Sequence, residues 1–357
     1  MLAVEDGKKQ IVSTLIQAAE KEAHKLLTTV RFGQNALTLA VLKNHKEIVS
    51  ILVNAIIQAS GMKNIISELT ETIDLEYKIT ASFMLSIKNG HTDIVRLFIK
   101  VAGDMADEFV TVINQNDFTT LMFAAQNGNP LIVSDLIRVA GQHSLKLLAA
   151  KNKLQQTALM FAAQYGHAEV VKIIIKTLIQ TVKGENEASQ FMLTTDKDKF
   201  TALMYAAQNG HASVVSILID ADNKSKASEE IIEVRKKHLQ SALTLACKSE
   251  HTNAAFTLID AIYSQQEDIC TLETHPIIRP FITRYMNHRG SLLYQALSNI
   301  LGMLGPLSIA ASYALEGEKT ESKVFTPLHT KTTRPSLPDR NISNEELSCE
   351  ALSKLEL

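Results

Sequence analysis

One stretch of sequence recurs along this chain, and the recurrence constrains the fold more than any other feature. Three near-identical copies read TALMYAAQNGHASVVSIL at Thr201–Leu218, TALMFAAQYGHAEVVKII at Thr157–Ile174 and TTLMFAAQNGNPLIVSDL at Thr119–Leu136. Weaker copies occupy Asn35–Leu52, Ala81–Phe98 and Ser241–Leu258, and Met1–Ile16 matches the second half of the pattern. Self-similarity at a period of a few tens of residues is typical of a repeat architecture. The sequence therefore predicts six full units and one truncated unit.

Each unit has the features of two short helices joined by a tight turn. The Thr or Ser that opens the apolar run can cap the first helix through its side-chain oxygen. A glycine such as Gly166 or Gly210 can then end that helix in the left-handed conformation. The second helix carries branched apolar residues at helical spacing, at Val170, Val171, Ile174 and Ile175. One such pair cannot bury its apolar face alone, so the units must stack into an all-α solenoid.

The repeated pattern T-A-L-M-x-A-A-x-x-G-H resembles the ankyrin repeat, whose consensus is T-P-L-H-x-A-A-x-x-G-H, over roughly two-thirds of the chain. Methionine replaces the first histidine of that consensus at Met122, Met160 and Met204. The glycine of the family's hairpin loop is present only as Gly33, and the corresponding positions elsewhere are Asp117, Gln155 and Lys199. These departures predict altered hairpin loops, without the hydrogen bonds that the replaced histidine makes between repeats.

The units are longer than ordinary ankyrin units. Intervals of 37 to 46 residues separate the turn positions Gly7, Asn44, Gly90, Gly128, Gly166, Gly210 and Glu250; an ordinary unit has about 33 residues. The additional residues follow the second helix, as in 51–73 and 173–193, and predict lengthened outer helices or an inserted helical turn. The charged segment Asp222–Lys237 is predicted to be a solvated loop that leads into a short helix.

Three regions follow from where the repeat signature ends. Residues 1–262 are assigned to the array, and residues 263–316 to a C-terminal helical cap. Within that cap, 291–315 is a run of 25 residues without a charge, which is long enough to span a bilayer but is interrupted by glycine and proline. A hairpin that caps the last repeat is the prediction there, and membrane association is the alternative. The segment 317–357, rich in Ser, Thr, Pro and Glu, is predicted to be disordered.

The end of the chain carries a second resemblance. Glu345, Glu346 and Glu350 lie close to an apolar C-terminus. This resembles the glutamate-rich export signals of effectors that intracellular bacteria secrete through type IV systems. It implies, as an alternative, an effector exported into a host cell; an acidic solvated tail is the other explanation.

The overall composition favours a protein that works in a reducing compartment. A net charge of −2 does not favour nucleic acid as a partner. The three cysteines, Cys247, Cys270 and Cys349, are scattered and odd in number, which argues against a disulfide framework. No signal-peptide pattern is visible at the N-terminus. We therefore expect a cytoplasmic monomer.

The sequence predicts no enzyme: it contains no motif for a catalytic, cofactor or metal site. A phosphate-binding glycine loop, HExxH, CxxC and G-x-S-x-G are all missing. Five histidines occupy the same turn position in successive units, at His45, His91, His167, His211 and His251. One imidazole per repeat suits a role in the turn better than a metal site. An unrecognised active site within 262–316 is disfavoured because ionisable groups do not cluster there.

The remaining candidate is a surface that binds a protein. In the ankyrin family the inner helices and hairpin tips form a concave partner-binding face, so the resemblance implies this role for the variable positions. By alignment these positions are Phe118, Phe123, Gln126, Phe161, Gln164, Tyr165, Phe200, Tyr205 and Gln208. Phe118 and Phe200 are expected to be exposed; Phe123, Phe161 and Tyr205 either line the groove or pack between repeats. The predicted function is therefore a non-enzymatic protein–protein interaction scaffold.

Overall fold

The computed structural model divides into two units, Met1–Gln265 and Gln266–Leu357. It describes residues 1–19, 35–60, 82–111, 113–114, 116–182, 187–224, 228–264 and 275–289. In the second unit, the described residues 279–289 form a helix. Residues 291–315 and 317–357, predicted as part of a cap and as a disordered tail, lie outside the described residues. None of the helices that the structure describes combines the length and the apolar character needed to cross a membrane.

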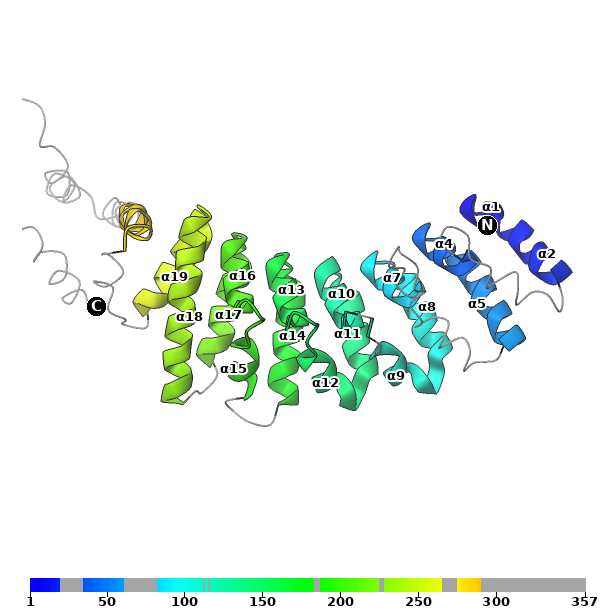
Figure 1. The fold of residues 1–357 in the computed structure, drawn as a ribbon, viewed down its shortest axis with the longest axis horizontal. Helices are drawn as coiled ribbons and strands as arrows, with labels where there is room; N and C mark the ends of the chain where they lie inside the picture. The colour runs from blue at the N-terminus through cyan, green and yellow to red at the C-terminus, as the bar shows by residue number, and fades with distance from the viewer. Residues whose placement is uncertain are drawn as a thin grey trace, which may run out of the picture. The chain divides into compact units, whose positions relative to one another are not determined.

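Helix pairs stacked side by side in two layers build the first unit (Figure 1). Each helix contacts the helix of the same layer in the next repeat. The first layer consists of α1 (Leu2–Glu5), α4 (Ala36–Leu42), α7 (Ser82–Lys88), α10 (Thr120–Asn127), α13 (Ala158–Gln164), α16 (Ala202–Gln208) and α18 (Glu229–Lys248). The second layer consists of α2 (Lys9–Ala19), α5 (Lys46–Ser60), α8 (Thr92–Ala102), α11 (Pro130–Ala140), α14 (Ala168–Thr181), α17 (Ala212–Lys224) and α19 (Thr252–Ser264). The predicted all-α solenoid is confirmed.

The first helices start where the sequence predicts. The hydroxyl groups of Thr119, Thr157 and Thr201 accept hydrogen bonds of 3.1, 3.4 and 3.3 Å from the backbone N–H groups three residues later. Asn35 caps α4 in the same way, with its side chain accepting from the N–H of Thr38 at 2.8 Å. These bonds satisfy amide groups that have no partner within the helix.

The seven predicted turn positions all have positive φ, between +57° at Asn44 and +79° at Gly128. Five of them are glycines, which adopt this conformation without a steric cost. Asn44 and Glu250 adopt it as non-glycine residues. The position of every turn is therefore predictable from the repeat alignment, even where glycine is replaced.

Short helices after the second helix account for the long units. They are η2 (Gly103–Met105), α9 (Ala106–Val110), η3 (Gly141–His143), α12 (Ser144–Ala149) and α15 (Glu187–Met192). Helix α9 contacts α8 and α11, and α12 contacts α11 and α14. We call the helices of the first layer inner and those of the second layer outer. The outer helices α5 and α14 are also lengthened, to 15 and 14 residues. Both predicted explanations are therefore present.

The predicted solvated loop at Asp222–Lys237 is wrong for the described residues. Helix α17 continues to Lys224, and α18 runs for 20 residues from Glu229 into the first layer. The Nε of Arg235 lies 2.8 Å from a carboxylate oxygen of Asp222, and these side chains are only 12% and 19% exposed. Arg235 and the buried Leu239 and Ala242 recur at helical spacing. The surrounding charges concealed this amphipathic pattern.

Candidate protein-binding surface

Three hairpin loops precede α10, α13 and α16, and we name them loop A (113–114 and 116–119), loop B (151–157) and loop C (195–201). Each loop is organised by one side chain, that of Asn114, Asn152 or Asp196. Its Oδ1 accepts hydrogen bonds of 2.8 to 3.0 Å from the backbone N–H groups two and four residues later. Asn and Asp commonly hold turns in this way.

The loops keep their left-handed residue although the family's glycine is replaced. The φ angles are +58° at Asp117, +63° at Gln155 and +62° at Lys199. The prediction of altered hairpin loops is therefore wrong. The Asn or Asp side chain at the start of each loop holds the backbone in a conformation that is costly for a residue with a Cβ.

The loops are joined to one another. The N–H of Lys153 in loop B donates to the carbonyl of Asn116 in loop A at 3.2 Å, and the N–H of Lys197 in loop C donates to the carbonyl of Leu154 at 3.0 Å. Tyr205 adds a side-chain link, because its hydroxyl donates to Asp196 at 2.6 Å and accepts from Gln156 at 3.1 Å. Burial, together with the hydrogen bond to Asp196, raises the pKa of Tyr205 to about 12. The three loops therefore form one pre-organised edge.

Turn histidines provide hydrogen bonds between repeats. The Nε2 atoms of His167 and His211 lie 3.0 Å from the carbonyl oxygens of Gln126 and Gln164 in the preceding unit. The sulfur atoms of the replacing methionines, Met122 and Met160, accept instead from the N–H of the capping threonine in their own unit, at 3.5 Å. His167 and His211 thus have the structural role at the turn that the sequence suggests.

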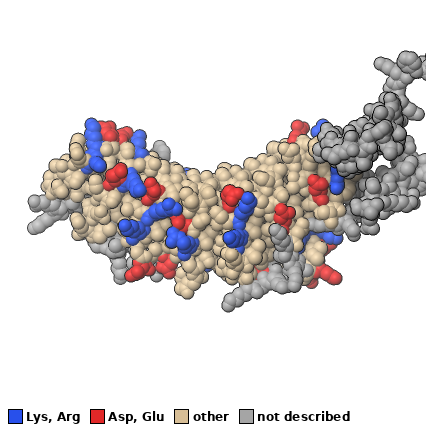
Figure 2. Space-filling model, turned by 180° about the vertical axis from the view of Figure 1, so that it is seen from behind, with Lys and Arg blue, Asp and Glu red and all other residues tan. Residues whose placement is uncertain are grey.

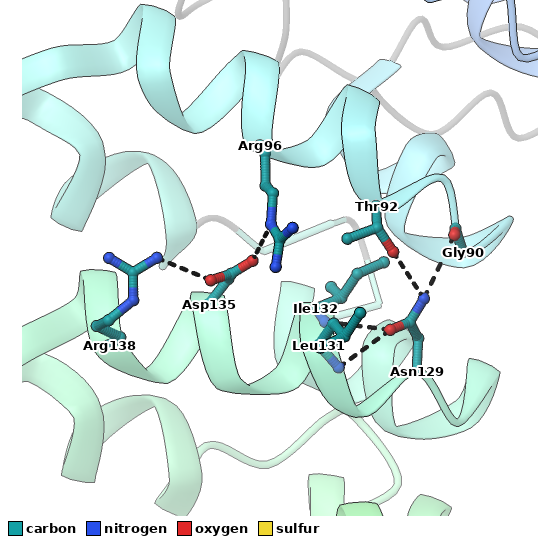
Figure 3. A network of polar contacts seen from close by, with 8 residues as sticks. All are labelled: Gly90, Thr92, Arg96, Asn129, Leu131, Ile132, Asp135 and Arg138. Atoms are coloured by element: carbon teal, nitrogen blue, oxygen red, sulfur yellow. Dashed lines mark hydrogen bonds and ion pairs between the residues drawn. The ribbon is translucent and has the colours of Figure 1, made fainter.

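The unit that begins with Thr119 has Asn129 at the histidine position. Its Oδ1 accepts from the N–H groups of Leu131 and Ile132 at 3.1 and 3.2 Å, which caps α11 (Figure 3). Its Nδ2 donates to the hydroxyl of Thr92 at 2.9 Å in the preceding unit. Asparagine therefore combines a helix cap with the contact between repeats.

A second contact in Figure 3 joins the outer helices α8 and α11. Asp135 is buried and binds Arg96 of α8 and Arg138 of its own helix, each at 2.7 Å. Burial raises the pKa of Asp135, but the hydrogen bonds and charges of the two arginines outweigh it and hold the pKa below its ordinary value. The carboxylate balances one of the two arginine charges, and the side chains of Arg96 and Arg138 remain 51% and 71% exposed. The contact therefore joins α8 to α11 and leaves positive charge at their surface.

Two of the predicted binding residues belong to the packing between repeats. Phe123 and Phe161 are only 7% and 6% exposed. Phe118 is half-buried, with its ring centroid 5.3 Å from that of Phe123 and 5.0 Å from that of Phe161. Phe200 is likewise half-buried, 5.2 Å from Tyr205. The expectation of exposed Phe118 and Phe200 is therefore corrected, because aromatic rings beneath the loops cover them.

The other predicted positions retain accessible atoms. Tyr165 is 48% exposed, and its hydroxyl accepts from the side chain of Gln126 at 3.1 Å. Gln208 is exposed, whereas Gln126, Gln164 and Tyr205 are half-buried. These residues bring apolar ring surface and amide groups to the inner helices, and their role in binding stays a prediction.

Sequence reasoning missed five exposed residues of loops B and C. Leu154 is 56% exposed, and Lys151, Lys153, Lys197 and Lys199 around it are exposed as well. The available signal was the position of four of them between the Asn or Asp that organises the loop and the following Thr; Lys151 directly precedes Asn152. On the face shown in Figure 2, by contrast, charges of both signs lie close to one another.

The described residues offer little for catalysis. They contain no group of three His, Cys, Asp or Glu that could hold a metal ion. A cavity lined by Asp222, Arg235 and His238 has a volume of about 30 Å³, comparable to one water molecule. Burial raises the pKa of the Cys247 thiol to about 12, which makes it unreactive.

Stacked helix pairs with projecting hairpin loops define a solenoid repeat protein. The family model for ankyrin repeats (three copies) matches residues 1–104, 83–186, 121–227 and 178–270. The chain belongs to the ankyrin-repeat family. Members of this family are generally protein–protein interaction modules. No curated protein matches the chain.

Proposed function

We propose that this protein is a non-enzymatic scaffold that binds a protein partner through the inner helices and loops A–C of its central repeats. The observation that carries the proposal is the joined edge of loops A–C, which holds exposed side chains beside uncharged inner helices. Binding to such a fixed surface requires little ordering of the scaffold, which favours affinity.

A scaffold of this kind acts by occupancy. It brings its partner to a place or covers one of the partner's surfaces, and it needs no reacting group. Tyr165, Tyr205 and the neighbouring amides provide amphipathic contact groups of the kind enriched in protein interfaces. The partner is therefore expected to contact several adjacent repeats at once.

An exported effector is the alternative setting for the same scaffold. The sequence feature that favours it is the group Glu345, Glu346 and Glu350 near the C-terminus. In that case the partner is a host protein, and residues 291–315 could hold the complex near a membrane. A secretion assay that compares the full chain with a triple Glu→Ala variant at these positions tests export separately from binding.

Site-specific photo-crosslinking tests the proposed function. A photoreactive amino acid is placed at Leu154 or Gln208, which are exposed on the proposed surface, and, as controls, at Lys172 or Lys176, which are exposed on the outer helix α14. Each full-length variant is irradiated in eukaryotic cell lysate, and adducts are identified by mass spectrometry. We expect one protein to be captured from both inner positions and from neither control. Capture of a protein from α14 alone would overturn the assignment of the surface.

A further inference from the structure

Four lysines and one leucine lie together on loops B and C: Lys151, Lys153, Leu154, Lys197 and Lys199. All five side chains are exposed. The hydrogen bond from the N–H of Lys197 to the carbonyl of Leu154, 3.0 Å long, places the two loops side by side. We name this set the lysine ridge.

The positive charge of the lysine ridge is not neutralised by ion pairs. Within the part of the chain that the structure describes, the ion pairs of lysine involve Lys8, Lys46, Lys172 and Lys237 and none of the ridge lysines. Asp196 is buried and accepts hydrogen bonds from its own loop and from Tyr205. Asp198 is the exposed acidic residue of these two loops. A positive patch thus persists on a chain whose net charge is −2.

We propose that the lysine ridge binds an acidic segment of the protein partner, in which carboxylates flank an apolar side chain that contacts Leu154. This inference rests on the proposed function and specifies the chemistry of its partner. Complementary charge speeds encounter and excludes basic competitors. Leu154, at 56% exposure, offers an apolar contact next to Lys153 and beside Lys197 of loop C.

Three features favour a protein segment over a nucleic acid or a membrane. Loops B and C contain no arginine, and their aromatic residue Phe200 is half-buried against Tyr205. Single-stranded nucleic acids are usually held by exposed aromatic rings and arginine. A single exposed leucine is also too small an apolar surface to insert into a lipid interface.

A peptide selection on the full-length chain tests the inference. The probe is a library of short peptides with a fixed central leucine and flanking positions drawn from Asp, Glu, Lys, Arg, Ser and Gln. We expect the retained peptides to be enriched in Asp and Glu, and to lose at least tenfold in affinity between about 50 and about 300 mM salt. Retained peptides without acidic enrichment would overturn the proposed partner chemistry.

Matched variants assign the binding to the ridge. In the ridge variant, Lys151, Lys153, Lys197 and Lys199 are all changed to Gln; glutamine already occupies the left-handed position of loop B, at Gln155. The control variant makes the same change at four exposed lysines that lie outside the loops, Lys100 of α8, Lys146 of α12, and Lys172 and Lys176 of α14. The affinity for a selected acidic peptide should fall at least tenfold in the ridge variant and less than twofold in the control. Equal losses in both variants would contradict the inference.

Other ligand classes are examined with the same two variants. A single-stranded oligonucleotide or an anionic lipid vesicle that binds through the ridge more tightly than the acidic peptide would overturn the inference. The proposed function has its own test. If a protein is captured by photo-crosslinking at Gln208 and the ridge variant captures it equally well, the scaffold function stands and the acidic partner segment is excluded.

Discussion

The turn glycines provide space as well as a positive φ. A Cβ added at Gly166 or Gly210 would lie 2.6 Å from the Nδ1 of His211 or His251 in the next repeat. Only glycine lets the imidazole take this position, from which His211 reaches the carbonyl of Gln164. For His91, the corresponding turn position in the preceding repeat is Asn44 and not glycine. The Nε2 of His91 is buried without a hydrogen-bond partner among the described residues.

Asn44→Gly is therefore expected to stabilise the array. The change relieves the cost of a left-handed non-glycine residue and lets His91 approach the turn, for a gain of about 1 kcal/mol in the free energy of unfolding. Urea denaturation of Asn44→Gly alone, and of Asn44→Gly in a His91→Ala background, separates the backbone effect from the contribution of His91. The gain should shrink in the double variant. An equal gain in both backgrounds would show that the histidine is not involved.

Asp222 gives a pH dependence with a defined sign. Burial raises its pKa to about 6 although Arg235 opposes this, so the folded chain binds the proton more tightly than the unfolded chain. The stabilising contribution is complete below the unfolded pKa, near 4, and is lost as the pH rises through 6. The free energy of unfolding of the native chain minus that of Asp222→Asn should thus fall by about 2 kcal/mol between about pH 4 and pH 7. His238, whose pKa burial lowers, is present in both proteins. If chemical denaturation shows that this difference in free energy of unfolding rises with pH, the pKa of Asp222 is not raised in the folded chain.

At the scale of the element, the short helices α9, α12 and α15 contribute buried residues to the core. Phe109 of α9 is fully buried, and its ring centroid lies 4.1 Å from that of Phe83 in α7. The length of the repeat unit predicts an inserted helical turn, because the unit has additional residues after its second helix. The contact between Phe109 and Phe83 follows from tertiary packing and cannot be predicted from the local sequence. The same holds for α18, whose charges suggested a loop.

Phe109→Ala and Phe118→Ala separate these roles. We expect Phe109→Ala to lower the free energy of unfolding by about 3–5 kcal/mol, because it leaves a cavity between two layers. Phe118 is half-buried, so its removal should cost less than about 2 kcal/mol, leave the helical circular dichroism unchanged and weaken partner binding. Similar losses of stability in the two variants would show that loop A is as much a part of the core as α9.

At the scale of the whole array, the repeat pattern predicts the fold well and the binding surface only in part. Caps such as Thr157 and turns such as Gly166 are local, so the sequence alone places them. Whether Phe161 lines a groove or packs between units depends on how closely neighbouring repeats approach, which no single unit determines. The exposed lysine ridge depends likewise on hydrogen bonds between loops. Stacking therefore decides which variable residues remain available to a partner.

Hydrogen–deuterium exchange of the full-length chain, with and without the partner captured by crosslinking, shows which surface of the array the partner covers. We expect slower exchange in loops A, B and C and at the ends of α10, α13 and α16 when the partner is bound, with α11, α14 and α17 unchanged. Protection confined to those outer helices, or to the residues after 265, would contradict a partner-binding surface on the inner helices and loops.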